Sequence, residues 1–176
     1  MRIDVDTLAE EGESFAHTYG VEDLSLDDER ARLIEGAEIR GRAKREDSQV
    51  RLHGMVAART EVACDRCLRP VVVPVETEFD ATYIPAALDT TGAGEAAELQ
   101  ADEMDVDIYE GNEIDIDRLV REQVLLALPV RLLCSEECKG LCPTCGADLN
   151  TETCACEQRE TDPRWAALAN LKQDVK

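Results

Sequence analysis

Eight cysteines are the residues of this 176-residue chain whose type and spacing could do chemistry. Cys64 and Cys67 form a C-x-x-C motif, and the other six lie in the run CSEECKGLCPTCGADLNTETCAC, from Cys134 to Cys156. Tetrahedral zinc and iron sites take four sulfur ligands, and one tight turn can present two of them. Cysteines in pairs at this spacing therefore predict metal binding.

The run C-P-T-C-G is the most specific of these pairs. Pro143 restricts its own φ angle, and Gly146 gives the backbone the freedom to aim amide N–H groups at sulfur. The last two cysteines follow after a turn, so they can fold back on this pair, although their one-residue spacing leaves open that only one of them binds. The expected ligands of this site are Cys142, Cys145, Cys154 and Cys156.

The remaining four cysteines meet the requirement for a second site. They are Cys64, Cys67, Cys134 and Cys138. Such a site would join distant parts of the chain and remove much of the entropy of the unfolded state. The alternative is a single C-terminal site that draws on Cys134 or Cys138 and leaves Cys64 and Cys67 as a thiol pair. We therefore expect one or two zinc ions.

Two other chemistries also use paired cysteines. A C-P-x-C-G run occurs in rubredoxin-like iron proteins, but aromatic residues pack those sites and make up only 3% of this chain. Arg66 would lower the pKa of a neighbouring thiol and so favour redox chemistry. The surrounding sequence lacks the βαβ pattern of a thioredoxin-like fold, so zinc remains the expected cofactor.

Residues that would support catalysis are scarce. The two histidines, His17 and His53, lie far apart in the sequence, and there is no G-x-S-x-G, phosphate-binding or H-E-x-x-H motif. The many carboxylates show no pattern beyond that of a solvated surface. We expect no catalytic residues, no small-molecule substrate and no enzymatic activity.

The charge of the chain is strongly acidic but uneven. The formal net charge is -20, which disfavours broad non-specific binding to nucleic acid. Basic residues nevertheless outnumber acidic ones between positions 37 and 70. We interpret the acidic surface either as a general property of a soluble protein or as a face for a basic partner. The candidate contacts to RNA or to a partner are Arg40, Arg42, Lys44, Arg51 and Arg59.

The apolar residues show no targeting segment. The sequence has neither a signal-like N-terminus nor an apolar run long enough to span a bilayer. We therefore expect a cytoplasmic protein that makes no membrane contact. In that reducing compartment, paired cysteines favour metal binding over disulfides.

The pattern of apolar residues predicts an α+β fold. Alternation with a period of two begins at Val50 and again at Val71, and a weaker strand covers residues 37–44. A turn at residues 46–48 joins the first two strands, so we expect an antiparallel β-meander. Cys64 and Cys67 would then lie at the tip of a hairpin, where two thiolates can converge.

The rest of the chain is predicted around this meander. An acidic linker covers residues 86–112, and a packed helix covers 114–128 with Asp115 as its N-cap. We expect a short strand at 130–133 and a final helix that starts at Pro163 after Asp162. Residues 1–32 look irregular, apart from a short strand at 1–5 and a helical turn within 24–33. We divide the chain into an α+β body, residues 1–133, and a Cys-rich zinc-ribbon-like module with the C-terminal helix, residues 134–176.

Four stretches together resemble the YceD-like family of large ribosomal RNA subunit accumulation proteins. They are CDRCL at 64–68, the acidic stretch leading into IDI at 114–116 and VREQVLLALP at 120–129, CKGLCPTCG at 138–146 followed by Leu149 and Asn150, and DPRWAAL at 162–168. The resemblance covers roughly residues 60–172. It implies a role in the accumulation or processing of large-subunit ribosomal RNA, and it supplies no catalytic residues.

Three functions fit these observations. The first is a non-enzymatic ribosome-biogenesis factor that binds large-subunit rRNA, its precursor particles or a basic ribosomal protein. The second is a zinc-ribbon adaptor in transcription or in another protein complex. The third is a thiol redox or electron-transfer protein. The resemblance favours the first.

Overall fold

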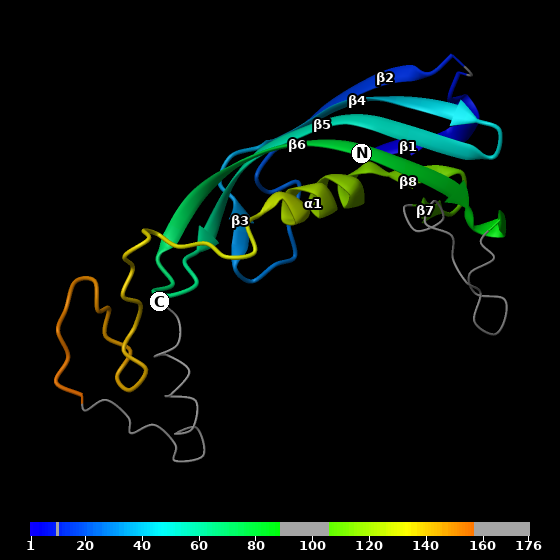
Figure 1. The fold of residues 1–176 in the computed structure, drawn as a ribbon. Coiled ribbons are helices and arrows are strands. Elements are labelled where there is room, and N and C mark those ends of the chain that lie inside the picture. Colours follow the sequence, from blue (N-terminus) through cyan, green and yellow to red (C-terminus); the bar gives the residue numbers. More distant parts are fainter. Residues whose placement is uncertain (10, 89–105, 157–176) are drawn as a thin grey trace, which may run out of the picture.

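A long, strongly curved β-sheet with one helix in its hollow forms the body of the protein (Figure 1). The structure is a computed structural model, and it describes residues 1–9, 11–88 and 106–156. The strand order in the large sheet is β2-β4-β5-β6-β7, and β3 pairs with β5 beside this path. A small second sheet joins β1 and β8. No helix in the described ranges is long and apolar enough to cross a membrane.

The three central strands form the predicted antiparallel meander. These strands are β4 (Ala37–Glu46), β5 (Gln49–Ala63) and β6 (Pro70–Pro85). A tight turn at Asp47 and Ser48 joins β4 to β5, and Asp47 takes a positive φ of 54° there. The β5–β6 pairing ends at Ala63 opposite Pro70, so the C-x-x-C motif lies at the hairpin tip as expected.

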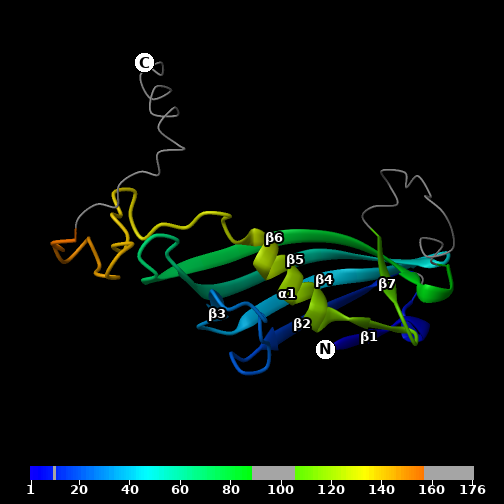
Figure 2. The same ribbon diagram turned by 90° about the horizontal axis from the view of Figure 1, so that it is seen from below.

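The concave face of this sheet packs against α1 (Ile116–Ala127) (Figure 2). Along β5 the even-numbered residues Val50, Leu52 and Val56 are buried, while Arg51 and His53 are exposed on the other face. The helix buries Ile116, Leu119, Val120 and Val124. Burial of these aliphatic side chains supplies the main stabilisation of the fold, because the chain has few aromatic residues.

The predicted N-cap of the helix is confirmed. The Asp115 carboxylate accepts hydrogen bonds from the backbone N–H groups of Asp117 (3.0 Å) and Arg118 (3.4 Å). The helix begins at Ile116, because Ile114 belongs to β8 (Glu113–Asp115) and pairs with Ile3 of β1 (Arg2–Asp4). The predicted strand at the N-terminus is therefore also present.

The N-terminal region is more regular than we expected. It contains η1 (Val5–Thr7), β2 (Glu13–Tyr19) and β3 (Ala31–Leu33). The helical turn expected within residues 24–33 is wrong, because the carboxylate of Asp28 accepts hydrogen bonds from the backbone of Arg30 and Ala31 and leads the chain into β3. The strand pairings of β2 and β3 involve distant segments, which local pattern does not reveal.

Two further expectations need correction. Residues 130–133 form no strand: Val130 is fully exposed, Leu132 supplies the backbone hydrogen bonds to the hairpin, and Leu133 packs against the cysteines at its tip. The region expected as a linker contains η2 (Ala86–Leu88) and β7 (Val106–Tyr109), which pairs in parallel with β6. The final helix expected after Asp162 lies outside the described residues.

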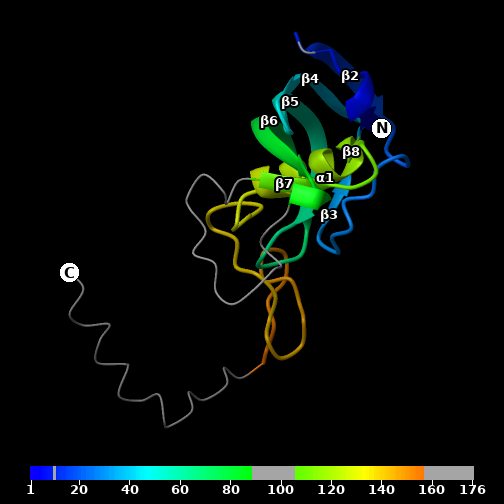
Figure 3. The same cartoon turned by 90° about the vertical axis from the view of Figure 1, so that its right-hand side faces the viewer.

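A pair of facing glycines lets the sheet close up between β4 and β5. Gly41 lies opposite Gly54, and Phe15 and Phe79 flank them on the neighbouring strands (Figure 3 shows the four strands end on). A Cβ atom added at Gly54 would lie 2.2 Å from the carbonyl oxygen of Arg40 and 2.6 Å from the Cα of Gly41. Both contacts are with backbone, so side-chain rearrangement cannot relieve them.

We predict that Gly54→Ala destabilises the folded state by about 1–3 kcal/mol, because the added methyl group forces β4 and β5 apart. Urea unfolding followed by circular dichroism measures the loss. His53→Ala is the matched control, since His53 is the exposed neighbour of Gly54. Equal stability of Gly54→Ala and the wild type would contradict this view of the strand contact.

Candidate metal centres

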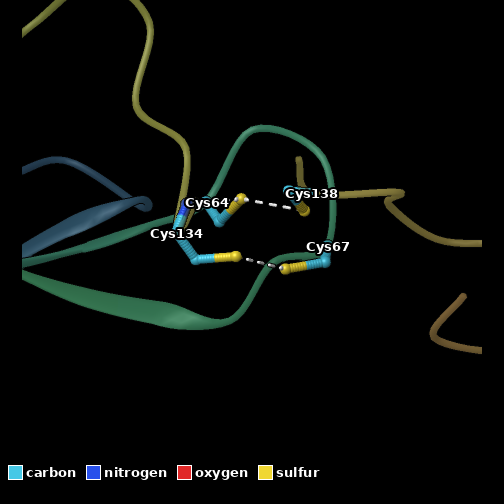
Figure 4. A group of neighbouring side chains, drawn as sticks. All are labelled: Cys64, Cys67, Cys134 and Cys138. Carbon is cyan, nitrogen blue, oxygen red and sulfur yellow. Dashed lines mark hydrogen bonds between the residues drawn. The ribbon is translucent and has the colours of Figure 1, made fainter. Parts of the chain in front are cut away.

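The first group of four cysteines joins the β5–β6 hairpin to the segment after α1 (Figure 4). Cys64 and Cys67 come from the hairpin tip, and Cys134 and Cys138 come from the other segment. The sulfur of Cys64 lies 3.9 Å from that of Cys138, and the sulfur of Cys67 lies 3.5 Å from that of Cys134. Cys64 and Cys138 are almost fully buried.

Backbone contacts around Asp65 bring the second segment to the hairpin. The N–H of Asp65 donates to the carbonyl oxygen of Leu132 (2.9 Å), and the N–H of Leu132 donates to the Asp65 carboxylate (2.6 Å). Two residues later the N–H of Cys134 donates to the sulfur of Cys64 (3.3 Å). Residues 130–133 therefore position Cys134 and do not extend a sheet.

The second group of cysteines lies within a short segment, residues 142–156. It consists of Cys142, Cys145, Cys154 and Cys156. The N–H of Cys142 donates to the carbonyl oxygen of Ala147 (2.8 Å), and this contact folds the chain back after the second cysteine. Cys142 is buried while Cys145 is exposed, so this group lies closer to solvent than the first.

The two C-x-x-C turns share one backbone conformation. In the first, the N–H of Leu68 donates to the carbonyl oxygen of Cys64, and in the second the N–H of Gly146 donates to that of Cys142, both at 2.9 Å. Leu68 and Gly146 both take the left-handed conformation, with φ of 59° and 76°. A residue with a Cβ pays roughly 1–2 kcal/mol there. Alignment of the two turns in the sequence would have identified Leu68, which our sequence analysis missed.

Backbone N–H groups prepare one thiol in each group for ionisation. Hydrogen bonds from the backbone of Cys67, and then of Arg66 and Cys134, lower the pKa of Cys64 to about 6. The backbone of Cys145 and of Thr144 lowers the pKa of Cys142 to about 6. These two thiols are therefore largely thiolate at neutral pH, which is the form that binds metal.

One thiol in each group instead holds its proton at neutral pH. The hydrogen bond with Cys67 raises the pKa of Cys134 to about 12, and the hydrogen bond with Cys145 raises the pKa of Cys156 to about 12. Four cysteines that cannot all ionise side by side favour a divalent cation among them, because the cation compensates the thiolate charge.

Both groups have the dimensions of a tetrahedral metal site. All four sulfur atoms within each group lie within 4.8 Å of one another. Zinc–sulfur bonds of about 2.3 Å place the sulfurs of a tetrahedral site about 3.8 Å apart. A disulfide would need about 2.05 Å, which the two short sulfur pairs of the first group exceed. Each group could therefore hold one metal ion, and the eight cysteines divide as the sequence predicted.

The five predicted basic contact residues share the convex face of the sheet, away from α1, although Arg59 lies beyond the end of the β4–β5 pairing. All five are exposed, and Lys44 lies opposite Arg51 in the strand register. Several are paired with acids: Arg51 with Asp80 (2.6 Å), Arg59 with Glu35 (3.0 Å) and Lys44 with Glu46 (2.8 Å). The charge of these three is therefore partly neutralised.

Arg40 and Arg42 carry the basic character of this face. Within the described residues they form no ion pair: Arg40 contacts the sulfur of Met55 (3.5 Å), and Arg42 donates to the carbonyl oxygen of Glu11 (2.6 Å). Both border a shallow hollow of about 690 Å³ that His53 and Met55 also line. Glu78 and Asp80 on β6 form its other side, so the hollow is basic on one side and acidic on the other.

The sequence matches the family described as large ribosomal RNA subunit accumulation protein YceD over residues 52–172. This range contains all eight cysteines. The chain is also similar to Uncharacterized protein YlbN of Bacillus subtilis (strain 168), with 30% identity over 162 residues. That alignment covers 91% of this chain and 88% of the relative.

Two further relatives are longer than this chain. Large ribosomal RNA subunit accumulation protein YCED homolog 1, chloroplastic, of Zea mays is 30% identical, and the alignment covers 80% of this chain and 61% of that protein. Uncharacterized protein Rv2926c of Mycobacterium tuberculosis is 36% identical over 121 residues, which cover 67% of this chain and 53% of that protein. The chain thus spans a little over half the length of these two relatives. No solved structure matches.

We predict that the full chain, purified with zinc, contains two ions, because each cysteine group supplies a complete set of four ligands. Elemental analysis measures the stoichiometry. Cys64→Ser with Cys138→Ser should leave one ion, and so should Cys142→Ser with Cys145→Ser. Ser135→Ala, which lies between two of the cysteines, is the control and should keep two. One ion in the wild type would contradict the division into two sites.

Proposed function

Because the chain belongs to the YceD family of large ribosomal RNA subunit accumulation proteins, we propose that it supports the accumulation of large-subunit ribosomal RNA. The single observation that carries this proposal is the family match over residues 52–172, and the similarity to the maize protein of that family supports it. In this proposal the protein supports rRNA accumulation as a non-enzymatic factor, through binding and not through a reaction of its own.

The donor set of the two cysteine groups supports a structural role for the metal. Four cysteine sulfurs use all the coordination positions of a tetrahedral zinc ion, whereas catalytic zinc sites keep one position open for water or substrate. Zinc suits an all-sulfur set and carries out no redox chemistry. We therefore propose zinc in both groups, with a role in folding and none in catalysis.

The position of the first group indicates what this zinc stabilises. It lies where the β5–β6 hairpin meets the C-terminal module, at the end of the body (Figure 1). Besides the cysteines, the contacts across this junction include Arg66 with the carbonyl oxygen of Cys138 (2.6 Å) and Arg69 with Asp148 (2.9 Å). A zinc ion adds bonds to both sides and so fixes the module relative to the sheet.

The convex face of the sheet is the surface that we propose for contact with ribosomal RNA or its precursor particles. Its exposed basic residues come from adjacent strands and point to the same side, away from α1. Arg40 and Arg42 are available to phosphate oxygens, since neither has a carboxylate partner within the described residues. The acidic row on β6, with Glu76, Glu78 and Asp80, limits non-specific binding to other nucleic acid.

We predict that depletion of the protein reduces the large ribosomal subunit relative to the small one, because large-subunit rRNA then fails to accumulate. Sucrose-gradient profiles and quantification of the two large rRNAs measure this effect. Wild-type protein expressed from a second copy of the gene should restore the profile. An unchanged large-subunit peak after depletion would remove the proposed function.

We predict that Arg40→Glu with Arg42→Glu weakens co-sedimentation with large-subunit precursors by at least tenfold, since the change replaces two phosphate contacts by repulsion. Arg2→Glu with Arg131→Glu is the matched control: it changes the charge equally at exposed sites outside strands β2 to β6. Circular dichroism checks that both variants fold. If the variant no longer binds RNA but still co-sediments with large-subunit precursors, the result would instead favour a ribosomal protein as the partner.

A further inference from the structure

We propose that Asn150 couples the two cysteine groups, so that metal in the second group raises the metal affinity of the first. This inference rests on the proposed zinc sites and goes beyond them, because it concerns how one site influences the other. Asn150 is not one of the proposed metal ligands, and it lies in the loop between Cys145 and Cys154. It acts as a positioning residue.

The side chain of Asn150 reaches from the second group to a ligand of the first. Its amide nitrogen Nδ2 lies 3.6 Å from the sulfur of Cys138, and its oxygen Oδ1 accepts the backbone N–H of Lys139 at 2.8 Å. The two contacts hold the amide plane in one orientation, with its N–H directed at sulfur. Cys138 is almost fully buried, so water cannot easily supply this hydrogen bond in its place.

A hydrogen bond to a metal-bound thiolate has a defined effect. It removes part of the negative charge that four thiolates accumulate, and it fixes the orientation of the ligand. Loss of such an outer contact typically reduces metal affinity by about 10–100-fold. Asn150 is therefore positioned to raise the affinity of the first group, although it lies outside its ligand set.

The second group controls whether Asn150 is in place. The loop that carries Asn150 is held at its start by the turn at Cys142 and Cys145, and it ends at Cys154, so three ligands of the second group bracket it. Within the loop, the N–H of Leu149 donates to the carbonyl oxygen of Gly140 (2.9 Å). A metal ion that joins both ends of this loop restricts it to the conformation in which Asn150 faces Cys138.

Asp148 links the loop of the second group to the hairpin that carries Cys64 and Cys67. Its carboxylate accepts the Nδ2 group of Asn150 (2.6 Å) and also the guanidinium of Arg69 (2.9 Å), which lies two residues after Cys67. The loop of the second group thus contacts both segments that carry the first group. Coupling between two binding sites is reciprocal, so metal in the first group must raise the affinity of the second by the same factor.

The test is a double-mutant cycle on the full chain, with cadmium as the probe. Cadmium NMR gives each four-sulfur site its own signal, and competition with a chelator of known affinity gives the affinity of each site. Cys64→Ser and Cys142→Ser assign the two signals. The cycle compares the wild type, Asn150→Ala, Cys142→Ser with Cys145→Ser, and the combination of these changes. Thr151→Ala, in the same loop, is the control.

We expect Asn150→Ala to weaken the first site by about 10–100-fold, with Thr151→Ala close to the wild type. Removal of the second site should weaken the first by a similar factor, and Asn150→Ala should then have no further effect. An equal effect of Asn150→Ala with and without the second site would overturn the coupling. An unchanged cadmium affinity of the first site after loss of the second site would also overturn it. This comparison does not depend on Asn150→Ala, so it remains informative even if that variant misfolds. Absence of both cadmium signals in the wild type would instead refute the proposed metal sites themselves.

Discussion

The convergence of four cysteine sulfurs at the tip of the β5–β6 hairpin is the constraint on which the arrangement of the molecule depends. The hairpin alone ends at Ala63 and Pro70, and the segment after α1 forms no strand with it. What holds the two together is a small set of contacts around Asp65 and the sulfur cluster. The body gains its stability from aliphatic packing under the curved sheet, whereas residues 134–156 contain few apolar side chains besides their cysteines. The proposed metal ions would supply the order that so short a segment cannot gain from apolar burial.

Charge on the protein is arranged in rows, and this arrangement makes the strongly acidic chain compatible with the proposed contact with RNA. A basic row on β4 and an acidic row on β6 flank the central strand β5, where Arg51 pairs with Asp80 of the acidic row. A net charge describes the average, while an RNA phosphate meets only the local potential within a Debye length of about 8 Å. A face with one basic row also fits recognition of a defined particle better than general binding to nucleic acid.

Much of the structure could be predicted from local pattern, and the failures have a common cause. The period-two alternation of β5 and β6, the Asp115 cap and the division of the cysteines all follow from residues close in sequence or from ligand number. The strands β2, β3 and β7 were not predicted, because their pairing partners are distant in the sequence and their own alternation of apolar and polar residues is weak. Residues 130–133 look like a strand, yet their backbone serves to deliver Cys134. Leu68 was overlooked because a leucine gives no sign of a left-handed backbone unless it is aligned with Gly146.

The separation of the first cysteine group along the chain has a consequence for its synthesis. Cys64 and its partner Cys138 are 74 residues apart. At about 5–20 residues per second, the ribosome delivers Cys138 roughly 4–15 s after Cys64. During that interval the hairpin can form, but its two thiols have no second pair with which to share a metal ion. The nascent chain therefore holds only half of the sulfur atoms of this group, and the group is complete only when translation has supplied Cys134 and Cys138.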